Sequence, residues 1–166
     1  MRRDRVHRAG RDRDPAGRPR NSRPRDATGR PLPRSATGVP RVPEGLTLPP
    51  AAALAEADRL LSTDSPFAAH EVLEGAWKSA PAPERDLWRG LAQLAVGLTH
   101  AQRGNRVGAV ELLRRGATRV EPYARQPPYG VAVGALVAAA AALAKRIDTQ
   151  GLDGIREDDL RLRLTS

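Results

Sequence analysis

Apolar residues recur at helical spacing along most of the chain after residue 48. The segment from 83 to 104 carries a stripe of leucines spaced by three or four residues, namely Leu87, Leu91, Leu94 and Leu98. Such spacing places the side chains on one face of a helix. Four further segments show the same period, so we predict five helices, at residues 49–62, 65–80, 83–104, 106–120 and 131–147. Because short turns make consecutive helices pack antiparallel, the predicted fold class is all-α, a compact bundle of about five helices.

Residues that begin and end helices occur at the boundaries of these segments. Ser65 and Asn105 stand where an N-cap is needed, and Pro66 and Pro83 stand in first turns, where proline is tolerated. Gly104 is placed to end the third segment. We therefore assign residues 47–147 to the helical bundle domain and residues 148–166, which begin with turn residues, to a C-terminal extension.

The first 46 residues have a different composition, dominated by Arg, Pro, Asp, Gly and Ser. Residues 1–45 contain 13 arginines and five acidic residues, a net charge of +8 out of +9 for the whole chain. Burial of so few apolar groups cannot offset the conformational entropy that this segment would lose on folding. Residues 1–46 are therefore predicted to be a disordered basic tail. Its charge favours weak, salt-dependent binding of nucleic acid or acidic partners. A solvated tail, or an over-extended gene start, is the alternative interpretation.

Composition also excludes several classes of protein. The chain has no cysteine, which excludes disulfides and thiolate metal sites. The N-terminus has charge but lacks the apolar core of a secretory signal. The longest apolar stretch, residues 131–144, is too short and too rich in alanine to span a bilayer. We therefore expect a cytoplasmic protein with no membrane partner.

The sequence HEVLEGAW, at residues 70–77, places ionisable groups among residues that read as core. With about 100° per residue, Glu74 lies near +40° and Trp77 near −20° from His70, so all three share one helix face. The spacing of four residues lets His70 and Glu74 meet directly. Because a buried carboxylate without a partner costs several kcal/mol, we expect a bond to His70, a metal or a polar ligand to satisfy it.

The third predicted helix carries a second seam of small and polar residues, formed by Gly90, Gln93, Gly97, His100 and Gly104. Glycine inside a helix costs about 1 kcal/mol relative to alanine, which indicates that a neighbouring backbone or ring lies close. We predict that this seam receives the face of His70, Glu74 and Trp77. Gln93 and His100 would then be the polar partners of the buried pair.

These motifs resemble the bacterial and archaeal "domain of unknown function 309" family over about residues 50–145. The family signature is a His, three residues, a Glu, two residues and a Trp, followed downstream by a His ahead of Gly-Asn. In this chain the pattern falls on His70, Glu74, Trp77, His100, Gly104 and Asn105. The resemblance implies a small all-helical domain. It also implies metal binding as a suggested property of the His/Glu motif, and it implies no defined activity.

Four interpretations of the motif remain open. His70, Glu74 and His100 could form a closed polar network under Trp77. They could instead bind Zn²⁺ or Fe²⁺, with Gln93 and Asn105 in support, because two imidazoles and a carboxylate suit these metals. His70 could act as a general base oriented by Glu74, although no nucleophile is placed beside it. The helices could also form an adaptor with a purely structural polar core, and association into a homo-oligomer is left open. The closed network is favoured over binding, and binding over catalysis.

Overall fold

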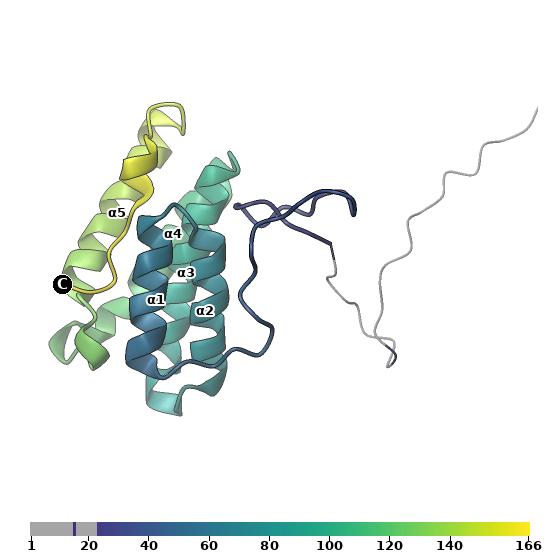
Figure 1. Ribbon diagram of the computed structural model, residues 1–166. Coiled ribbons are helices and arrows are strands. Elements are labelled where there is room, and N and C mark those ends of the chain that lie inside the picture. The colour runs from purple at the N-terminus through teal and green to yellow at the C-terminus, as the bar shows by residue number, and fades with distance from the viewer. Residues whose placement is uncertain (1–14, 16–22) are drawn as a thin grey trace, which may run out of the picture.

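The computed structural model describes residue 15 and residues 23–166. Within this part of the chain five α-helices form the fold: α1 Pro50–Ser62, α2 Pro66–Ser79, α3 Arg85–Gln102, α4 Arg106–Val120 and α5 Val133–Gln150 (Figure 1). Extended structure among the described residues is limited to two isolated bridges, Arg25 with Pro31 and Val131 with Thr165. The predicted all-α class is confirmed.

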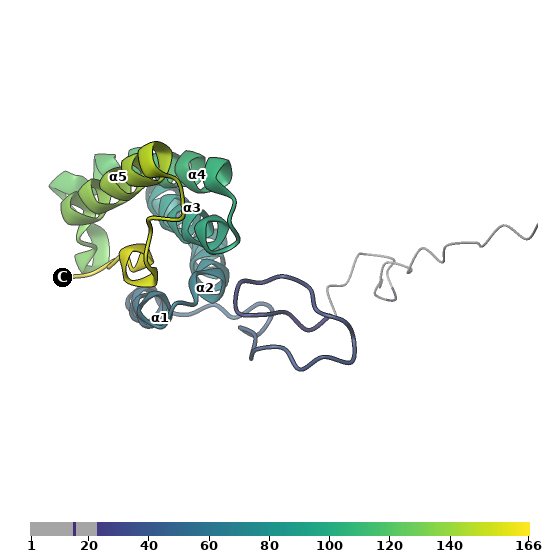
Figure 2. The ribbon, with the colours of Figure 1, turned by 90° about the horizontal axis from the view of Figure 1, so that it is seen from above.

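The five helices form an arc that begins with α1 and ends with α5 (Figure 2). Each helix packs against the next one along the chain. The connection between α4 and α5, residues 121–132, is longer than the others within the bundle. The predicted leucine stripe of α3 is fully buried at the centre of the arc. Trp88 is also buried, with 1% of its surface exposed, and therefore belongs to the core. None of the helices in the described part is long and apolar enough to cross a membrane; a cytoplasmic location stays a prediction.

The glycine seam of α3 faces α4, so the prediction that it receives the face of His70, Glu74 and Trp77 is wrong. A Cβ built on Gly90 would lie 2.5 Å from Val120 Cγ1, and one built on Gly97 would lie 3.0 Å from Leu113 Cγ. The turn at residues 103–105 is short and brings α4 alongside α3. Small residues at coiled-coil-like spacing fit any neighbouring helix, and the turn decides which helix that is.

The C-terminal residues close the open side of the arc. After α5 the chain folds back between α5 and α1 (Figure 2) and buries Leu162 and Leu164. The Asp58 carboxylate of α1 accepts hydrogen bonds from the backbone N–H groups of Leu164, at 2.6 Å, and Thr165, at 3.1 Å. The region predicted as an extension, residues 148–166, therefore completes α5 and contributes to the core.

Residues 23–48, which we call the strap, lie against α2 and the end of α3 rather than extending freely. Arg103 donates to the carbonyl oxygen of Thr28, and Arg30 donates to that of Arg103 at 2.8 Å. The Asp26 carboxylate accepts two backbone N–H bonds that hold the intervening turn. Hence the predicted disorder does not hold for residues 23–46, because local turns and arginine contacts replace the missing apolar burial.

The rest of the predicted disordered tail, residues 1–14 and 16–22, lies outside the described residues. Eight of the 13 arginines of the tail fall there. Nucleic-acid binding by the tail therefore stays a prediction.

Candidate functional site

The HEVLEGAW motif lies on α2, and its polar residues border the buried face of the helix. Pro66 occupies the first turn, and the helix buries Ala69, Val72, Leu73 and Ala76. The side chains of His70 and Glu74 keep 25% and 35% of their surface exposed, so the pair is only partly buried, contrary to expectation. The reason is geometric: the apolar arc of α2 is centred on Ala69 and Ala76, about 100° away from His70.

Three ionisable side chains follow one another along this border. His70 Nε2 lies 3.7 Å from Glu74 Oε2, as the spacing predicts. The other carboxylate oxygen, Oε1, lies 2.9 Å from Lys78 Nζ. Glu74 therefore lies between an imidazole and an ammonium group, and is satisfied by residues of its own helix.

The surroundings of His70 favour the neutral form of its imidazole. Burial lowers the pKa of the imidazole below its ordinary value of 6.5, the Glu74 carboxylate opposes this shift, and Lys78 adds to it. The ring packs against Phe67, with ring centroids 6.0 Å apart. Its Nδ1 atom is buried and has no hydrogen-bond partner among the described residues. The imidazole therefore retains one unused polar atom at the edge of the core.

The other predicted site residues lie against α4. Gln93 accepts a hydrogen bond from Arg119 Nε at 3.2 Å. His100 Nδ1 and Asn105 Nδ2 are hydrogen-bonded at 2.8 Å, and Asn105 Oδ1 caps α4 by accepting from the N–H of Gly108. The predicted N-cap at Asn105 is thus confirmed, and Gln93 and His100 have partners other than His70 and Glu74.

The described residues contain no group of three or more His, Cys, Asp or Glu side chains that could hold a metal ion. His70, Glu74 and His100 are therefore not brought together as three ligands, and the donor set does not fit the predicted Zn²⁺ or Fe²⁺ site. The motif has to be interpreted from its other surroundings.

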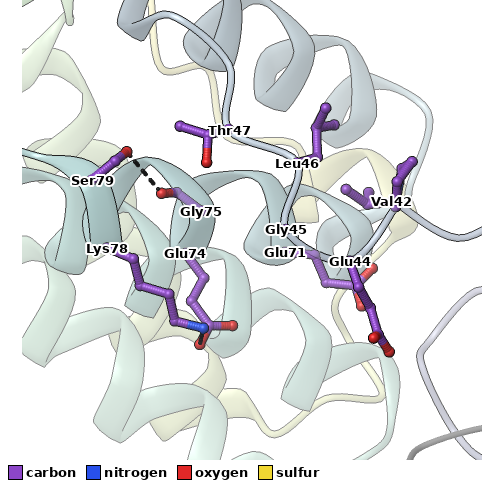
Figure 3. A pocket seen from close by; sticks show the side chains of 11 residues that line it. Val42, Glu44, Gly45, Leu46, Thr47, Glu71, Glu74, Gly75, Lys78 and Ser79 are labelled. Carbon is purple, nitrogen blue, oxygen red and sulfur yellow. Dashed lines mark hydrogen bonds and ion pairs between the residues drawn. The ribbon is translucent and has the colours of Figure 1, made fainter.

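A cavity of about 510 Å³ lies beside the motif, between α2 and strap residues 42–47 (Figure 3). Its α2 wall consists of Glu71, Glu74, Gly75, Lys78 and Ser79. Its strap wall consists of Val42, Pro43, Glu44, Gly45, Leu46 and Thr47. The sequence did not reveal this cavity, because one wall belongs to a segment predicted to be disordered.

Gly75 explains how the strap comes so close to the helix. A Cβ at this position would lie 2.7 Å from the carbonyl oxygen of Leu46, a distance that Cβ atoms do not adopt. Glycine inside a helix costs about 0.5–1 kcal/mol relative to alanine. A glycine within the motif was therefore the one sequence signal that a backbone packs against this face of α2.

The cavity is acidic. Three carboxylates line it, from Glu44, Glu71 and Glu74, against the single ammonium group of Lys78. Figure 3 shows Lys78 beside Glu74 at one end and Glu71 with Glu44 at the other. Burial raises the pKa of the Glu71 carboxyl; the Arg41 and Arg25 guanidinium groups oppose this shift, and the Glu74 and Glu44 carboxylates add to it to a smaller extent. The walls of the cavity thus carry more carboxylates than ammonium groups, and Arg41 and Arg25 act on its Glu71 end from outside the lining.

Trp77, the last motif residue, does not line this cavity. Its ring is half-buried and lies under the guanidinium of Arg89 on α3, with 5.5 Å between Cζ and the ring centroid. Trp77 thus joins α2 to the first turns of α3.

Comparison with known proteins finds a family model that matches part of the chain. Residues 54–112 match the model of the family described as "Domain of unknown function (DUF309)", a segment that includes the whole motif and the glycine seam. The chain is similar to the "Uncharacterized protein YpuF" of Bacillus subtilis (strain 168), with 46% identity over 48 residues. That match covers 28% of this chain and 28% of the relative, so the chain spans well under two thirds of the relative's length. No solved structure matches the chain.

Proposed function

Residues 54–112 match the model of the DUF309 family, and on this premise we propose that the protein binds a small, positively charged organic ligand in the cavity between the strap and α2. The observation that carries the proposal is the charge of the cavity. Three carboxylates line it with one ammonium group, and burial raises the pKa of Glu71 although Arg41 and Arg25 oppose the shift. A cationic ligand would favour the ionised form of Glu71 by direct attraction.

The size and spacing of the charged groups favour an organic cation over a single metal ion. The carboxylates are spread over the cavity, and the described residues contain no group of three that could hold a metal. A ligand with several amino groups can reach Glu71 and Glu44 at one end and Glu74 at the other. The aliphatic part of such a ligand would lie against Leu46 and Val42, which form the apolar part of the wall.

The proposal can be tested with spermidine, a linear triamine, as the probe. Isothermal titration calorimetry on the full-length protein at low salt should show saturable binding, and the melting temperature should rise with ligand concentration. Glu71→Gln and Glu44→Gln remove charge from the cavity with little change in volume. We expect each substitution to weaken binding about tenfold.

Glu111→Gln is the matched control, because Glu111 is exposed on α4 and pairs with Arg115 far from the strap. It should bind spermidine as the unmodified protein does. Equal binding by Glu71→Gln and Glu111→Gln would show that the amine associates with the general surface charge, and would contradict the proposal. Parallel titrations with Mg²⁺ and Zn²⁺ distinguish an organic cation from a metal ion.

A further inference from the structure

A second cavity, of about 460 Å³, lies where the end of α2 meets the start of α3. It is lined by Trp77, Lys78, Arg85, Asp86 and Arg89. We propose that this cavity binds the phosphate group of a small phosphorylated ligand, with Arg85 and Arg89 as the two residues that contact it. This site is separate from the acidic cavity and takes a ligand of opposite charge.

Arg89 is positioned for such contact by the motif. Its guanidinium lies over the Trp77 ring in a cation–π contact, with Cζ 5.5 Å from the ring centroid, which restrains the side chain. A cation–π contact uses none of the guanidinium N–H groups, so they can still donate hydrogen bonds. Among the described residues, no carboxylate forms an ion pair with Arg89. Its charge is therefore oriented but not neutralised.

Arg85 lies one helical turn before Arg89, on the same face of α3. Its Nε donates to the carbonyl oxygen of Ala80 at 3.2 Å, which anchors the base of the guanidinium and leaves the two terminal nitrogens available. Two arginines at this spacing repel each other and destabilise an isolated helix. An anion bound between them would remove the repulsion.

The other charges that line the cavity are already neutralised. Lys78 is paired with Glu74 at 2.9 Å. Asp86 accepts from Arg119 of α4, which offsets its negative charge. The cavity therefore keeps two uncompensated positive charges, both of them guanidinium groups.

The type of cation favours phosphate as the bound group. Guanidinium presents a rigid fork of N–H donors that matches the oxygen atoms of phosphate, and it stays charged at every physiological pH. The Trp77 ring restrains the Arg89 side chain before the ligand arrives. A nucleotide, a sugar phosphate and inorganic pyrophosphate share this chemistry and differ in what is attached to it.

The test is calorimetric titration of the full-length protein with pyrophosphate, ATP and glucose 6-phosphate at low salt, with tryptophan fluorescence as a second readout. We expect saturable binding of at least one of them and a change in the Trp77 emission. Arg89→Gln and Arg85→Gln should each weaken binding tenfold or more. Arg89→Lys should recover only part of the loss, because lysine keeps the charge and lacks the fork.

Arg115→Gln is the control, because Arg115 is an exposed arginine on α4 that does not line this cavity. It should bind the probes as the unmodified protein does, and circular dichroism should show that all variants are folded. Preference for ATP would identify a nucleotide site, and preference for glucose 6-phosphate a sugar phosphate site. Absence of binding for all three probes, or an equal loss in Arg89→Gln and Arg115→Gln, would overturn the proposal.

Discussion

Gly90 of α3 and Gly116 of α4 face each other across the contact between the two helices. The carbonyl oxygen of Gly90 lies 2.9 Å from the position that a Cβ on Gly116 would occupy, and that of Gly116 lies 3.2 Å from the corresponding position on Gly90. The two backbones therefore approach as closely as they do only because both residues lack a side chain.

Gly116→Ala should destabilise the protein although alanine is the better helix former. The new methyl group would meet Leu94 Cγ at 2.8 Å and backbone at 2.9 Å, so the helices would have to separate. Overpacking of this kind costs about 1–3 kcal/mol. Urea unfolding measures the change. Gly134→Ala in α5 is the control, because nothing lies within 4 Å of its Cβ position, and it should stabilise by up to about 1 kcal/mol. The same sign for both substitutions would contradict this account of the contact.

Gly29→Ala should release the strap from α2. Gly29 has a φ of 78°, and a Cβ there would lie 2.4 Å from the Phe67 ring. Gly45→Ala is a close control, since Gly45 has a φ of 77° and an open Cβ position. Hydrogen exchange of residues 23–41 should become faster in Gly29→Ala and change far less in Gly45→Ala. If both variants exchange alike, backbone strain and not the Phe67 contact governs the strap.

Asp58→Ala should loosen the C-terminal residues. The Asp58 carboxylate accepts from the N–H groups of Leu164 and Thr165 and from the Thr165 hydroxyl. Leaving these donors without a partner should cost about 1–3 kcal/mol. The loss should appear as a lower unfolding free energy and faster exchange at residues 162–165. Glu56→Ala, which breaks an exposed pair with Arg59 on the same helix, should cost less than about 1 kcal/mol.

The imidazole of His70 should titrate below pH 6.5 in the folded protein. Burial lowers its pKa, so the folded state binds fewer protons than the unfolded state, and stability falls as pH decreases from 6.5 through the folded pKa. NMR titration of the ring measures it. Glu74→Gln should lower the pKa further and Lys78→Gln should raise it, because the two charges act in opposite directions. A shift in the same direction for both variants would disprove the assignment of causes.

Glu71→Gln should stabilise the protein at neutral pH. The pKa of Glu71 is raised above 4.5 by burial, so ionisation of this carboxyl disfavours the folded state above the folded pKa. The penalty disappears as the pH falls below 4.5, where Glu71 is protonated in both states. Melting temperatures from pH 4 to 8 should therefore converge at the acid end. A constant difference across the range would attribute the effect to packing instead.

The sequence predicted the helices well and the neighbours of the motif poorly. The leucine stripe of α3 and the cap at Asn105 are local signals, and both are found where they were expected. The glycine seam does pack closely against another helix, but that helix is α4. The short turn at residues 103–105 determines this pairing, and the periodicity of the sequence carries no information about it.

The site was harder to foresee because half of it comes from the strap. Residues 42–47 have no periodicity and few apolar groups, so their contact with α2 has no signature beyond Gly75 in the partner helix. The apolar arc of α2 was also placed too near His70. The centre of the buried face of α2 includes alanines, such as the fully buried Ala69. Small residues of this kind contribute little to a hydrophobic pattern in the sequence.

The close approach of Leu46 to Gly75 means that the strap supplies one wall of the proposed ligand cavity, whereas the helices supply the folded core. A chain trimmed to begin at α1 would retain all five helices and the buried leucines of the core. It would lose the strap wall of the cavity that we propose to bind a ligand. Evolution can therefore change the residues of the strap, and with them the ligand preference of the proposed cavity, without altering the helices.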